Sequence, residues 1–366
     1  MKTLYINGKF LLQRTTGVER FSHGLVRSLD ESLVRHPAAN RVVLLTPPTA
    51  PILSLQVVKQ KVCGGVFGSL VAWEQISLPL ASRDGTLLCL SGSAPLLVRN
   101  IVSTIHDAAL YKYPEAYSWQ FVAWYRLLFR VLSKKAALLF TVSSNSASEL
   151  TKYLPGIEFK LVPNSAEHIL SNPADINVLA LLGITAKQYL LAVGSRNPTK
   201  NLSALIEAYS QARSVLKVPL IIVGESNRSV FSSGVPSDEG IPGVIFAGGV
   251  SDAALRALYE NALAFVFPSL YEGFGIPPLE AMLCGCPVVA SHAASIPEVC
   301  ADAAIYFDPV SVDDIARALK SITSNALLRE DLVGKGRKRS VQFNWANSAE
   351  ILRCHLQEAG LLSNAT

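Results

Sequence analysis

The sequence predicts an α/β protein that is built from two doubly wound parallel sheets. Short apolar runs alternate with amphipathic segments along all 366 residues, and this alternation is typical of parallel β/α units. The alternation restarts near residue 187, and the chain is long enough for two domains of ordinary size. Fully apolar strands such as Leu220–Val223 are what a sheet covered on both faces requires.

Each half of the chain supplies its own strands and helices. In the first half we predict strands at 3–6, 41–46, 86–90, 101–105, 137–142 and 159–162, and helices at 18–29, 116–133 and 146–153. In the second half we predict strands at 189–193, 220–223, 244–246, 264–268, 288–291 and 304–307, and helices at 202–212, 252–261, 278–284 and 312–321.

These elements define a domain plan. Residues 1–168 form an N-terminal domain, and residues 187–342 form a C-terminal domain. The segment 169–186 contains Ser171-Asn-Pro173 and no strand pattern, so we predict the interdomain linker there. Residues 343–366 are predicted to form a last helix that packs back toward the N-terminal domain.

Composition excludes several function classes. Half of the residues are hydrophobic and 17% are charged, which argues against disorder. No apolar run of 18 residues escapes a charge or a helix breaker, so no membrane-spanning helix is predicted, and Asn7, Gly8 and Lys9 interrupt the short N-terminal apolar run before it resembles a secretory signal. The net charge of +5 suits an anionic ligand or an anionic membrane surface, but no basic block points to nucleic acid.

The cysteines do not form a metal-binding or disulfide pattern. All six lie in apolar contexts without C-x-x-C spacing, and Cys284 and Cys286 are too close in sequence for a usual zinc pair. We interpret them as reduced core residues of a cytosolic protein.

The strongest functional signal is the segment Glu272-Gly-Phe-Gly-Ile-Pro-Pro-Leu-Glu280, which follows an apolar strand. Glycine lets the backbone approach a ligand, and proline in a first helical turn needs no amide partner. The two carboxylates, eight residues apart, are therefore predicted to face a cleft and to accept hydrogen bonds from hydroxyl pairs of a sugar and a ribose. The alternative for Glu280 is a cap on its own helix.

A second signal follows the first strand of the second half, in Gly194-Ser-Arg-Asn-Pro-Thr-Lys200. Arg196 and Lys200 are four residues apart on a loop that enters a helix, where an arginine fork and a lysine charge can hold a diphosphate. The alternative is a solvated surface pair, which the position at a strand end disfavours.

The first half carries two weaker signals. Gly17 opens a helix after Thr15-Thr16 and can admit phosphate oxygens to bare amides, although neither a G-x-G-x-x-G nor a Walker A pattern is present. Thr16 and Glu19 fit a capping box, so we interpret Glu19 as structural. His106 ends a strand, where it can donate hydrogen bonds to sugar hydroxyls or stabilise charge; a purely structural histidine is the alternative.

Taken together, these segments resemble the retaining GT-B glycosyltransferases of family 4, the group that includes bacterial mannosyl-, glucosyl- and rhamnosyltransferases. The resemblance is densest from Val244 to Pro309, through Phe246-Ala-Gly-Gly-Val-Ser-Asp252, the glutamate segment, Ser295-Ile-Pro-Glu-Val and Tyr306-Phe-Asp-Pro309. Weaker matches include Thr104-Ile-His-Asp107 and Val162-Pro-Asn-Ser165, so it covers nearly the whole chain. It implies a GT-B fold, in which two Rossmann-like domains face each other across a cleft.

The resemblance implies that the N-terminal domain, 1–168, holds the acceptor and that the C-terminal domain, 187–342, binds the nucleotide sugar. It also implies residue roles. Glu272 and His106 would act on the donor sugar near the reacting carbon, and Glu280 would bind the ribose hydroxyls. The diphosphate would be held by Arg196 and Lys200, by the amides of Phe274, Gly275 and Ile276, and by the backbone at Gly17 when the cleft closes.

The implied reaction retains the anomeric configuration and uses neither a metal nor a cofactor, with the nucleotide sugar as co-substrate. The sequence has no D-x-D, the usual metal–diphosphate clamp of the other major glycosyltransferase fold. The leaving-group charge must then be met by cations and helix amides.

The resemblance favours a hexose donor, with GDP-mannose as the first candidate and UDP-sugars next. The acceptor is expected to be a saccharide or a lipid-linked saccharide in bacterial surface polysaccharide synthesis, and the protein to be cytoplasmic. The segment 117–135 mixes aromatic with basic residues, which suits peripheral binding to the inner membrane, while an ordinary packing helix is the alternative.

Two other functions stay open on sequence alone. One is a nucleotide-sugar epimerase-like enzyme on the same fold, for which six histidines leave few extra acid–base groups. The other is a non-catalytic sugar-nucleotide-binding partner subunit, whose expected mark, the loss of Glu272, Lys200 or Arg196, is absent.

Overall fold

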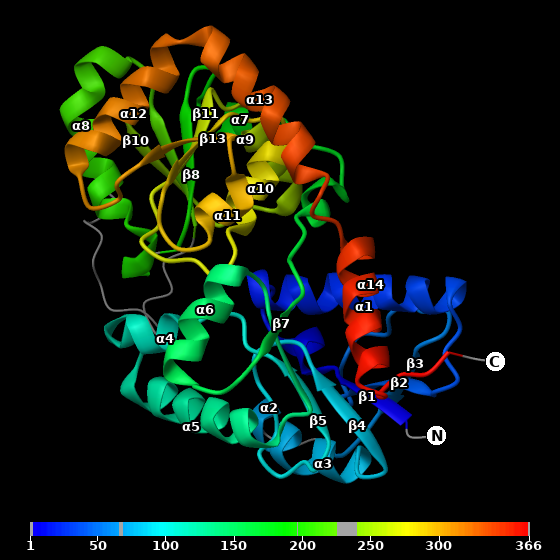
Figure 1. The fold of residues 1–366 in the computed structure, drawn as a ribbon. Coiled ribbons are helices and arrows are strands. Elements are labelled where there is room, and N and C mark those ends of the chain that lie inside the picture. The colour runs from blue at the N-terminus through cyan, green and yellow to red at the C-terminus, as the bar shows by residue number, and fades with distance from the viewer. Residues whose placement is uncertain (1–2, 66–68, 196, 225–239, 365–366) are drawn as a thin grey trace. The chain divides into compact units, whose positions relative to one another are not determined.

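A computed structural model of the chain describes residues 3–65, 69–195, 197–224 and 240–364. The chain forms two compact units (Figure 1). The first unit comprises residues 1–108, 123–165 and 344–366, and the second comprises 109–122 and 166–343.

The first unit is built on a parallel sheet of seven strands in the order β3-β2-β1-β4-β5-β6-β7. The order reverses between β1 and its neighbour β4, as in a doubly wound sheet. Three of the central strands are buried along their whole length, as in a sheet covered on both faces. The strands are β1 Thr3–Asn7, β2 Val42–Thr46, β3 Lys59–Val62, β4 Gly85–Cys89, β5 Ile101–Thr104, β6 Leu138–Thr141 and β7 Phe159–Leu161.

Helices of the first half of the chain, together with the C-terminal helix, accompany this sheet. They are η1 Lys9–Leu12, α1 Gly17–Arg35, α2 Leu70–Ala72, η2 Trp73–Ser77, α3 Leu78–Ala81, α4 Ala109–Lys112, η3 Pro114–Ala116, α5 Trp119–Lys135, α6 Ser144–Tyr153 and α14 Trp345–Glu358. Of these, α4, η3 and the first turn of α5 fall within the second unit.

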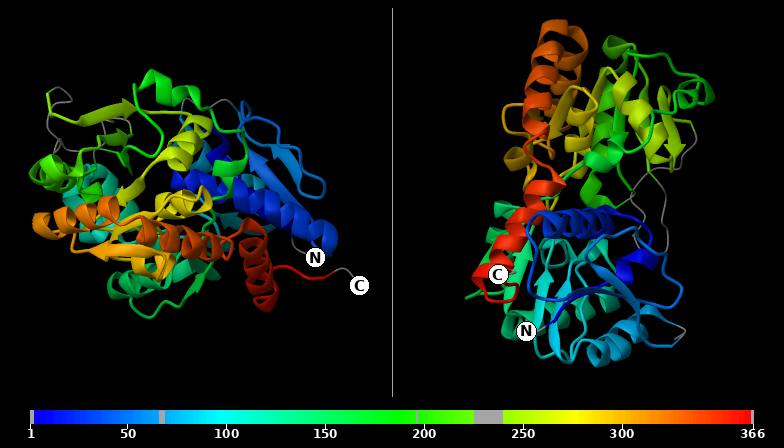
Figure 2. Two further views of the ribbon diagram at one scale, coloured as in Figure 1. Left: turned by 90° about the horizontal axis from the view of Figure 1, so that it is seen from above. Right: turned by 90° about the vertical axis from the view of Figure 1, so that its right-hand side faces the viewer.

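The C-terminal helix α14 lies beside α1 (Figures 1 and 2). Gly24 of α1 makes this possible, since a Cβ atom there would lie 2.2 Å from the ring of Trp345. The Trp345 ring packs edge-on against Phe21, and the Ser348 hydroxyl donates to the carbonyl of Pro163 at 2.8 Å. Residues 344–366 therefore fold with the first unit.

The second unit contains a parallel sheet of six strands in the order β10-β9-β8-β11-β12-β13. Successive strand residues face opposite helix layers, as the period of two requires. Leu190 and Ala192 pack with α8 and α12, whereas Tyr189 and Leu191 pack with α9 and α10. The strands are β8 Leu190–Val193, β9 Leu220–Val223, β10 Val244–Gly248, β11 Ala264–Phe267, β12 Val288–Ser291 and β13 Ala304–Phe307.

The helices of the second unit form these two layers and their connections (Figure 1). They are η4 Glu167–Leu170, α7 Asn177–Leu181, η5 Pro198–Lys200, α8 Leu202–Leu216, α9 Asp252–Asn261, α10 Ile276–Leu283, α11 Ile296–Cys300, α12 Val312–Ser324 and α13 Ala326–Ser340.

Three features of the fold lay outside the sequence prediction. Strand β3 is a polar edge strand whose residues are mostly exposed, so it has no apolar signature. The stretch Leu70–Ala81 breaks into short helical pieces around a π-helical turn. Helix α13 buries few of its residues, among them Leu332 and Gly336, and therefore lacks a wide apolar stripe.

The segment 169–186, where we expected a linker, is instead packed onto the second unit. Ile169, Val178 and Leu179 belong to the core beneath α9. The amide of Asp175 donates to the carbonyl of Ala253 at 2.9 Å, and the guanidinium of Arg256 donates to the carbonyl of Asn172 at 2.9 Å. Its two helices have only four and five residues, too few to show a helical period in the sequence.

Within the described part of the chain, no helix is long and apolar enough to cross a membrane.

Candidate functional site

The candidate donor site of the second unit lies where the strand order reverses, between β8 and β11. In open parallel sheets, ligands bind outside the carboxyl ends of the strands at this switch point. The loops after the two strands are joined there, since the amide of Leu270 donates to the carbonyl of Thr199 at 2.7 Å. Asn201, in the left-handed conformation, donates its side-chain amide to the carbonyls of Pro268 and Pro309.

Two predicted site residues meet across this switch point. Nζ of Lys200, on the loop after β8, lies 2.6 Å from Oε1 of Glu272, on the loop after β11. Nζ of Lys200 also lies 5.8 Å from the centre of the Phe267 ring. The two charged side chains retain 25% and 13% of their surface exposed, so they are partly open to a ligand.

The side chain of Ser295 anchors the loop that carries Glu272. Its buried hydroxyl lies 2.9 Å from the carbonyl oxygens of both Glu272 and Phe274. Gly275 has φ of 107°, a conformation that favours glycine, and it directly precedes α10. The loop is therefore fixed in shape before any ligand arrives.

The start of α10 contains two prolines directly after Ile276. Pro277 and Pro278 carry no amide hydrogen, so the amides available there come from Phe274, Gly275 and Ile276. These amides carry the partial positive charge of a helix start.

Glu280 lies in the second turn of α10 and is buried, with its residue surface 5% exposed. Oε1 lies 2.7 Å from Nε2 of His168 in η4, and Oε2 accepts a hydrogen bond of 2.9 Å from the hydroxyl of Tyr259 in α9. A buried carboxylate needs such partners. The sequence reasoning did not single out either partner, since a lone histidine and a helical tyrosine give no spacing signal.

In the first unit, Gly17 is the exposed first residue of α1. The amide of Thr16 donates to the Glu19 carboxylate at 3.0 Å, and the two residues form the capping box that the sequence predicted. The Glu19 carboxylate is therefore engaged in capping the helix. The first backbone amides of α1 lie next to Gly17.

His106 follows β5 and is already engaged by the protein. Its Nε2 lies 2.8 Å from the carbonyl oxygen of Leu90 and must donate to it, which leaves Nδ1 as the acceptor. Burial lowers the pKa of His106 to about 4, although the hydrogen bond to Leu90 opposes this shift. At neutral pH His106 is therefore uncharged, and toward a sugar it can accept a hydrogen bond rather than donate one.

A buried network that the sequence did not reveal lies at the switch point of the first sheet. Nζ of Lys9, just after β1, lies 2.8 Å from Oε2 of Glu74 in the π-helical turn η2. Oε1 of Glu74 accepts hydrogen bonds from Asn7 at 2.9 Å and Ser93 at 2.7 Å. The two charged side chains are only 8% and 3% exposed. In the sequence Lys9 is visible only as an interruption of an apolar run, because its partner Glu74 is 65 residues away.

The structure thus brings Lys200 and Glu272 into contact and places 274–276 on the same loop. Glu280 follows in α10 with partners of its own, and Gly17 and His106 belong to the first unit. Arg196 lies outside the described residues.

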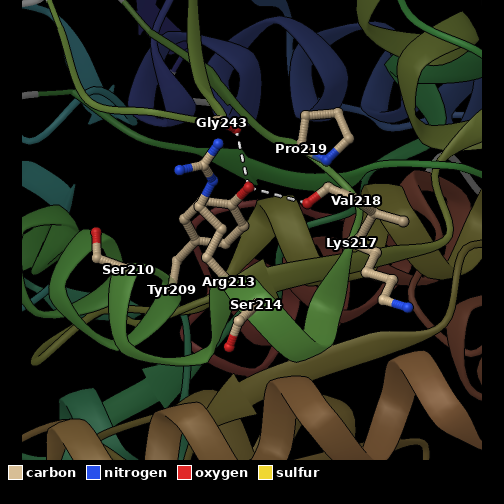
Figure 3. Close-up of a pocket in the computed structure, with 8 residues that line it drawn as sticks. All are labelled: Tyr209, Ser210, Arg213, Ser214, Lys217, Val218, Pro219 and Gly243. Atoms are coloured by element: carbon tan, nitrogen blue, oxygen red, sulfur yellow. Dashed lines mark hydrogen bonds between the residues drawn. The ribbon is translucent and has the colours of Figure 1, made fainter.

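A hollow elsewhere in the second unit is not this site. It has a volume of about 590 Å³ and is lined by Tyr209, Ser210, Arg213, Ser214, Lys217, Val218, Pro219 and Gly243 (Figure 3). The Tyr209 hydroxyl lies 2.9 Å and 3.0 Å from the carbonyls of Val218 and Gly243, which precede β9 and β10. The hollow therefore lies at the amino ends of the strands, opposite to the edge where such sheets bind ligands.

Comparison with known proteins identifies the family of the chain. Residues 182–339 match the family described as glycosyl transferases group 1. The chain is 32% identical over 262 residues to the O-antigen chain mannosyltransferase B of Escherichia coli, which covers 69% of each chain. It is 27% identical over 293 residues to the O-antigen chain mannosyltransferase RfbU of Salmonella typhimurium, which covers 78% of each.

The fold is also that of known glycosyltransferases. Sucrose-phosphate synthase of Thermosynechococcus elongatus superposes with a TM-score of 0.71 at 18% identity, over 98% of this chain and 99% of that one. The GT-B architecture of two Rossmann-like units, which the sequence resemblance implied, is thereby confirmed. The chain belongs to the glycosyl transferases group 1 family and is a glycosyltransferase.

Proposed function

We propose that the protein transfers a hexose from a nucleotide sugar to a saccharide or lipid-linked saccharide acceptor in bacterial surface polysaccharide synthesis. The observation that carries this proposal is the contact between Lys200 and Glu272 at the switch point of the second sheet. A cation and a carboxylate that face one ligand position suit a diphosphate and a sugar, respectively.

In this proposal, binding of the nucleotide sugar breaks the ion pair between Lys200 and Glu272. The diphosphate binds the Lys200 ammonium. Arg196 and the backbone amides of Gly17 and Phe274–Ile276 donate further hydrogen bonds to it. Glu272 is then released toward the sugar, where its carboxylate stabilises positive charge at the anomeric carbon.

The relatives favour mannose as the transferred sugar, since both are O-antigen chain mannosyltransferases. We therefore propose GDP-mannose as the donor, with UDP-sugars as the next candidates. A thermal-shift screen of nucleoside diphosphates tests this, because a ligand that binds only the folded state raises the unfolding temperature. GDP should give the largest shift; a larger shift with UDP would reassign the base and leave the site in place.

We propose that the transfer retains the anomeric configuration and requires neither a metal nor a cofactor. The leaving diphosphate is stabilised by Lys200 and backbone amides in place of a metal ion. Proton NMR of the first product formed from an α-linked donor should show the α-linkage, and transfer should persist in EDTA. A β-linked product, or activity that disappears with EDTA and returns with Mg²⁺, would contradict these two features separately.

Helix α5 supports a peripheral membrane location at the cytoplasmic face. Trp119, Leu127, Arg130 and Lys134 fall on one side of the helix by its 3.6-residue period, and Trp119 and Leu127 are 76% and 49% exposed. Exposed apolar residues beside basic ones favour an anionic lipid surface.

Sedimentation with phosphatidylglycerol vesicles tests this location. At low salt the protein should sediment with anionic vesicles and not with phosphatidylcholine alone. Arg130→Glu with Lys134→Glu should abolish sedimentation, whereas the exposed control Lys217→Glu should not. Equal sedimentation of all three proteins would remove α5 from the proposal.

Transfer also separates this proposal from its rivals. A non-catalytic subunit would bind the nucleotide sugar without transfer or hydrolysis, and an epimerase-like enzyme would release free sugar without an acceptor product. Appearance of a glycosylated acceptor, absent when the donor is omitted, is the expected outcome.

A further inference from the structure

Glu280 is held by two hydrogen-bond donors from different elements. His168 comes from η4, which follows the first unit in the chain, and Tyr259 comes from α9. Each binds a different carboxylate oxygen, at 2.7 Å and 2.9 Å. The carboxyl plane of Glu280 is thereby fixed, because rotation about its last bond would break both hydrogen bonds.

The protonation of His168 follows from its surroundings. Among the described residues, Nδ1 of His168 is buried and has no hydrogen-bond partner. A proton on Nδ1 would be an unsatisfied buried donor, whereas a proton on Nε2 satisfies the carboxylate. Nε2 therefore carries the hydrogen and donates to Glu280.

His168 itself cannot move easily. The next residue, Ile169, is 1% exposed within the core of the second unit. The amide of Ser171 donates to the carbonyl of His168 at 3.1 Å, and the guanidinium of Arg256 donates to the carbonyl of Leu170 at 3.3 Å. The imidazole is thus presented to Glu280 from an anchored turn.

The Glu280 carboxylate can accept further hydrogen bonds at defined positions. A carboxylate offers about four lone-pair positions, and His168 and Tyr259 occupy one on each oxygen. One position remains on each oxygen, at a fixed spacing. That pair of acceptors matches two neighbouring hydroxyl groups, as on the 2′ and 3′ carbons of a ribose.

We propose that His168 is a positioning residue for the donor: through Glu280 it sets the preference of the site for a ribose over a deoxyribose nucleotide. The proposal rests on the proposed role of Glu280 in ribose binding. His168 touches no ligand in this account, and Tyr259 acts in the same way from the other oxygen.

The test compares a nucleoside diphosphate with its 2′-deoxy form by calorimetry. The probes are GDP and 2′-deoxyGDP, with UDP and 2′-deoxyUDP used if the wild-type protein binds UDP more tightly. A hydrogen bond to a charged group corresponds to about tenfold in affinity, so the wild-type protein should prefer the ribose form by about that factor.

Four variants separate positioning from general damage. His168→Phe keeps an aromatic ring without a donor, and His168→Asn keeps polarity but is too short to reach the carboxylate. Both should reduce the preference to below about threefold, as should Tyr259→Phe. The control is Tyr189→Phe, which removes a buried hydroxyl that bonds the Leu258 carbonyl at 2.7 Å and does not touch Glu280; its preference should stay at the wild-type value.

Glu280→Gln distinguishes the failure of this inference from that of the proposed function. If Glu280→Gln keeps the wild-type preference, Glu280 does not bind the ribose, and both the role and the inference fall. If Glu280→Gln loses the preference but both His168 variants keep it, only the inference is overturned. Loss of the ribose preference in all three variants supports the inference if His168→Gln, whose longer side chain can bring its amide to the carboxylate, keeps part of that preference.

Discussion

Each unit has a lysine–glutamate pair at the switch point of its sheet, and the surroundings of the two pairs differ. Lys9 and Glu74 lie at the switch point of the first sheet, and Lys200 and Glu272 lie at that of the second. The first pair is almost fully buried, and Asn7 and Ser93 also bond Glu74. The second pair keeps 25% and 13% of its side-chain surface exposed.

The difference in burial distinguishes an ion pair that stabilises the fold from an ion pair whose lysine can bind a ligand instead. Breaking a buried pair leaves an uncompensated charge that water cannot reach. A partly exposed pair has a smaller desolvation cost, so a diphosphate can replace the carboxylate at Lys200. The same two residue types thus serve stability in one sheet and, we propose, donor binding in the other.

The largest expected effect is on transfer. Glu272→Gln should lower the transfer rate by about 10²–10³-fold, the usual result of removing one group that stabilises transition-state charge. The thermal midpoint should change little, because the side chain is partly exposed. Glu330→Gln, on the exposed side of α13, is the matched control and should retain full activity.

The next effect is on stability. Glu74→Gln leaves Lys9 buried without its counter-charge and should lower the free energy of unfolding by about 3–5 kcal/mol, measured by urea titration. Glu158→Gln breaks the pair between Glu158, whose side chain is 78% exposed, and Lys160, and it should lower the free energy of unfolding far less. Similar losses in both variants would erase the distinction between a buried and an exposed pair.

The smallest effect at neutral pH concerns His106, which belongs with the fixed groups of the first unit. Its pKa in the folded protein is about 4, below its ordinary value of 6.5, so the unfolded chain binds the proton first as the pH falls. Stability should therefore decrease from pH 6.5 to pH 4 and be unaffected by this group above pH 7. His106→Gln should flatten that slope; an unchanged slope would show that His106 does not titrate as described.

Much of the fold was predictable because parallel strands buried on both faces are apolar and short. The strand Leu220–Val223 and the helix Asp252–Asn261 have the bounds that we predicted. Elements with little apolar signal, such as the edge strand Lys59–Val62, were not predictable in this way. The folded segment 169–186 was missed because its helices have only four and five residues, too few for a helical period to show in the sequence.

The candidate site was predictable only where its residues cluster in sequence. Glu272 and Phe274–Ile276 stand in one motif, and Lys200 was found from its position at a strand end. The partners of these residues are distant in the chain: His168 lies 112 residues from Glu280, and Glu74 lies 65 residues from Lys9. Such pairs are set by the strand order and not by local spacing.

The central claim, that the pair at the second switch point is the diphosphate site, is tested most directly by calorimetry with Lys200→Met. The wild-type protein should bind GDP at least tenfold more tightly than guanosine, since hydrogen bonds from a charged donor each contribute about 1.5–3 kcal/mol. Lys200→Met should lose most of this preference for the diphosphate while guanosine binds as before. A variant that still prefers GDP by the wild-type factor would contradict the account.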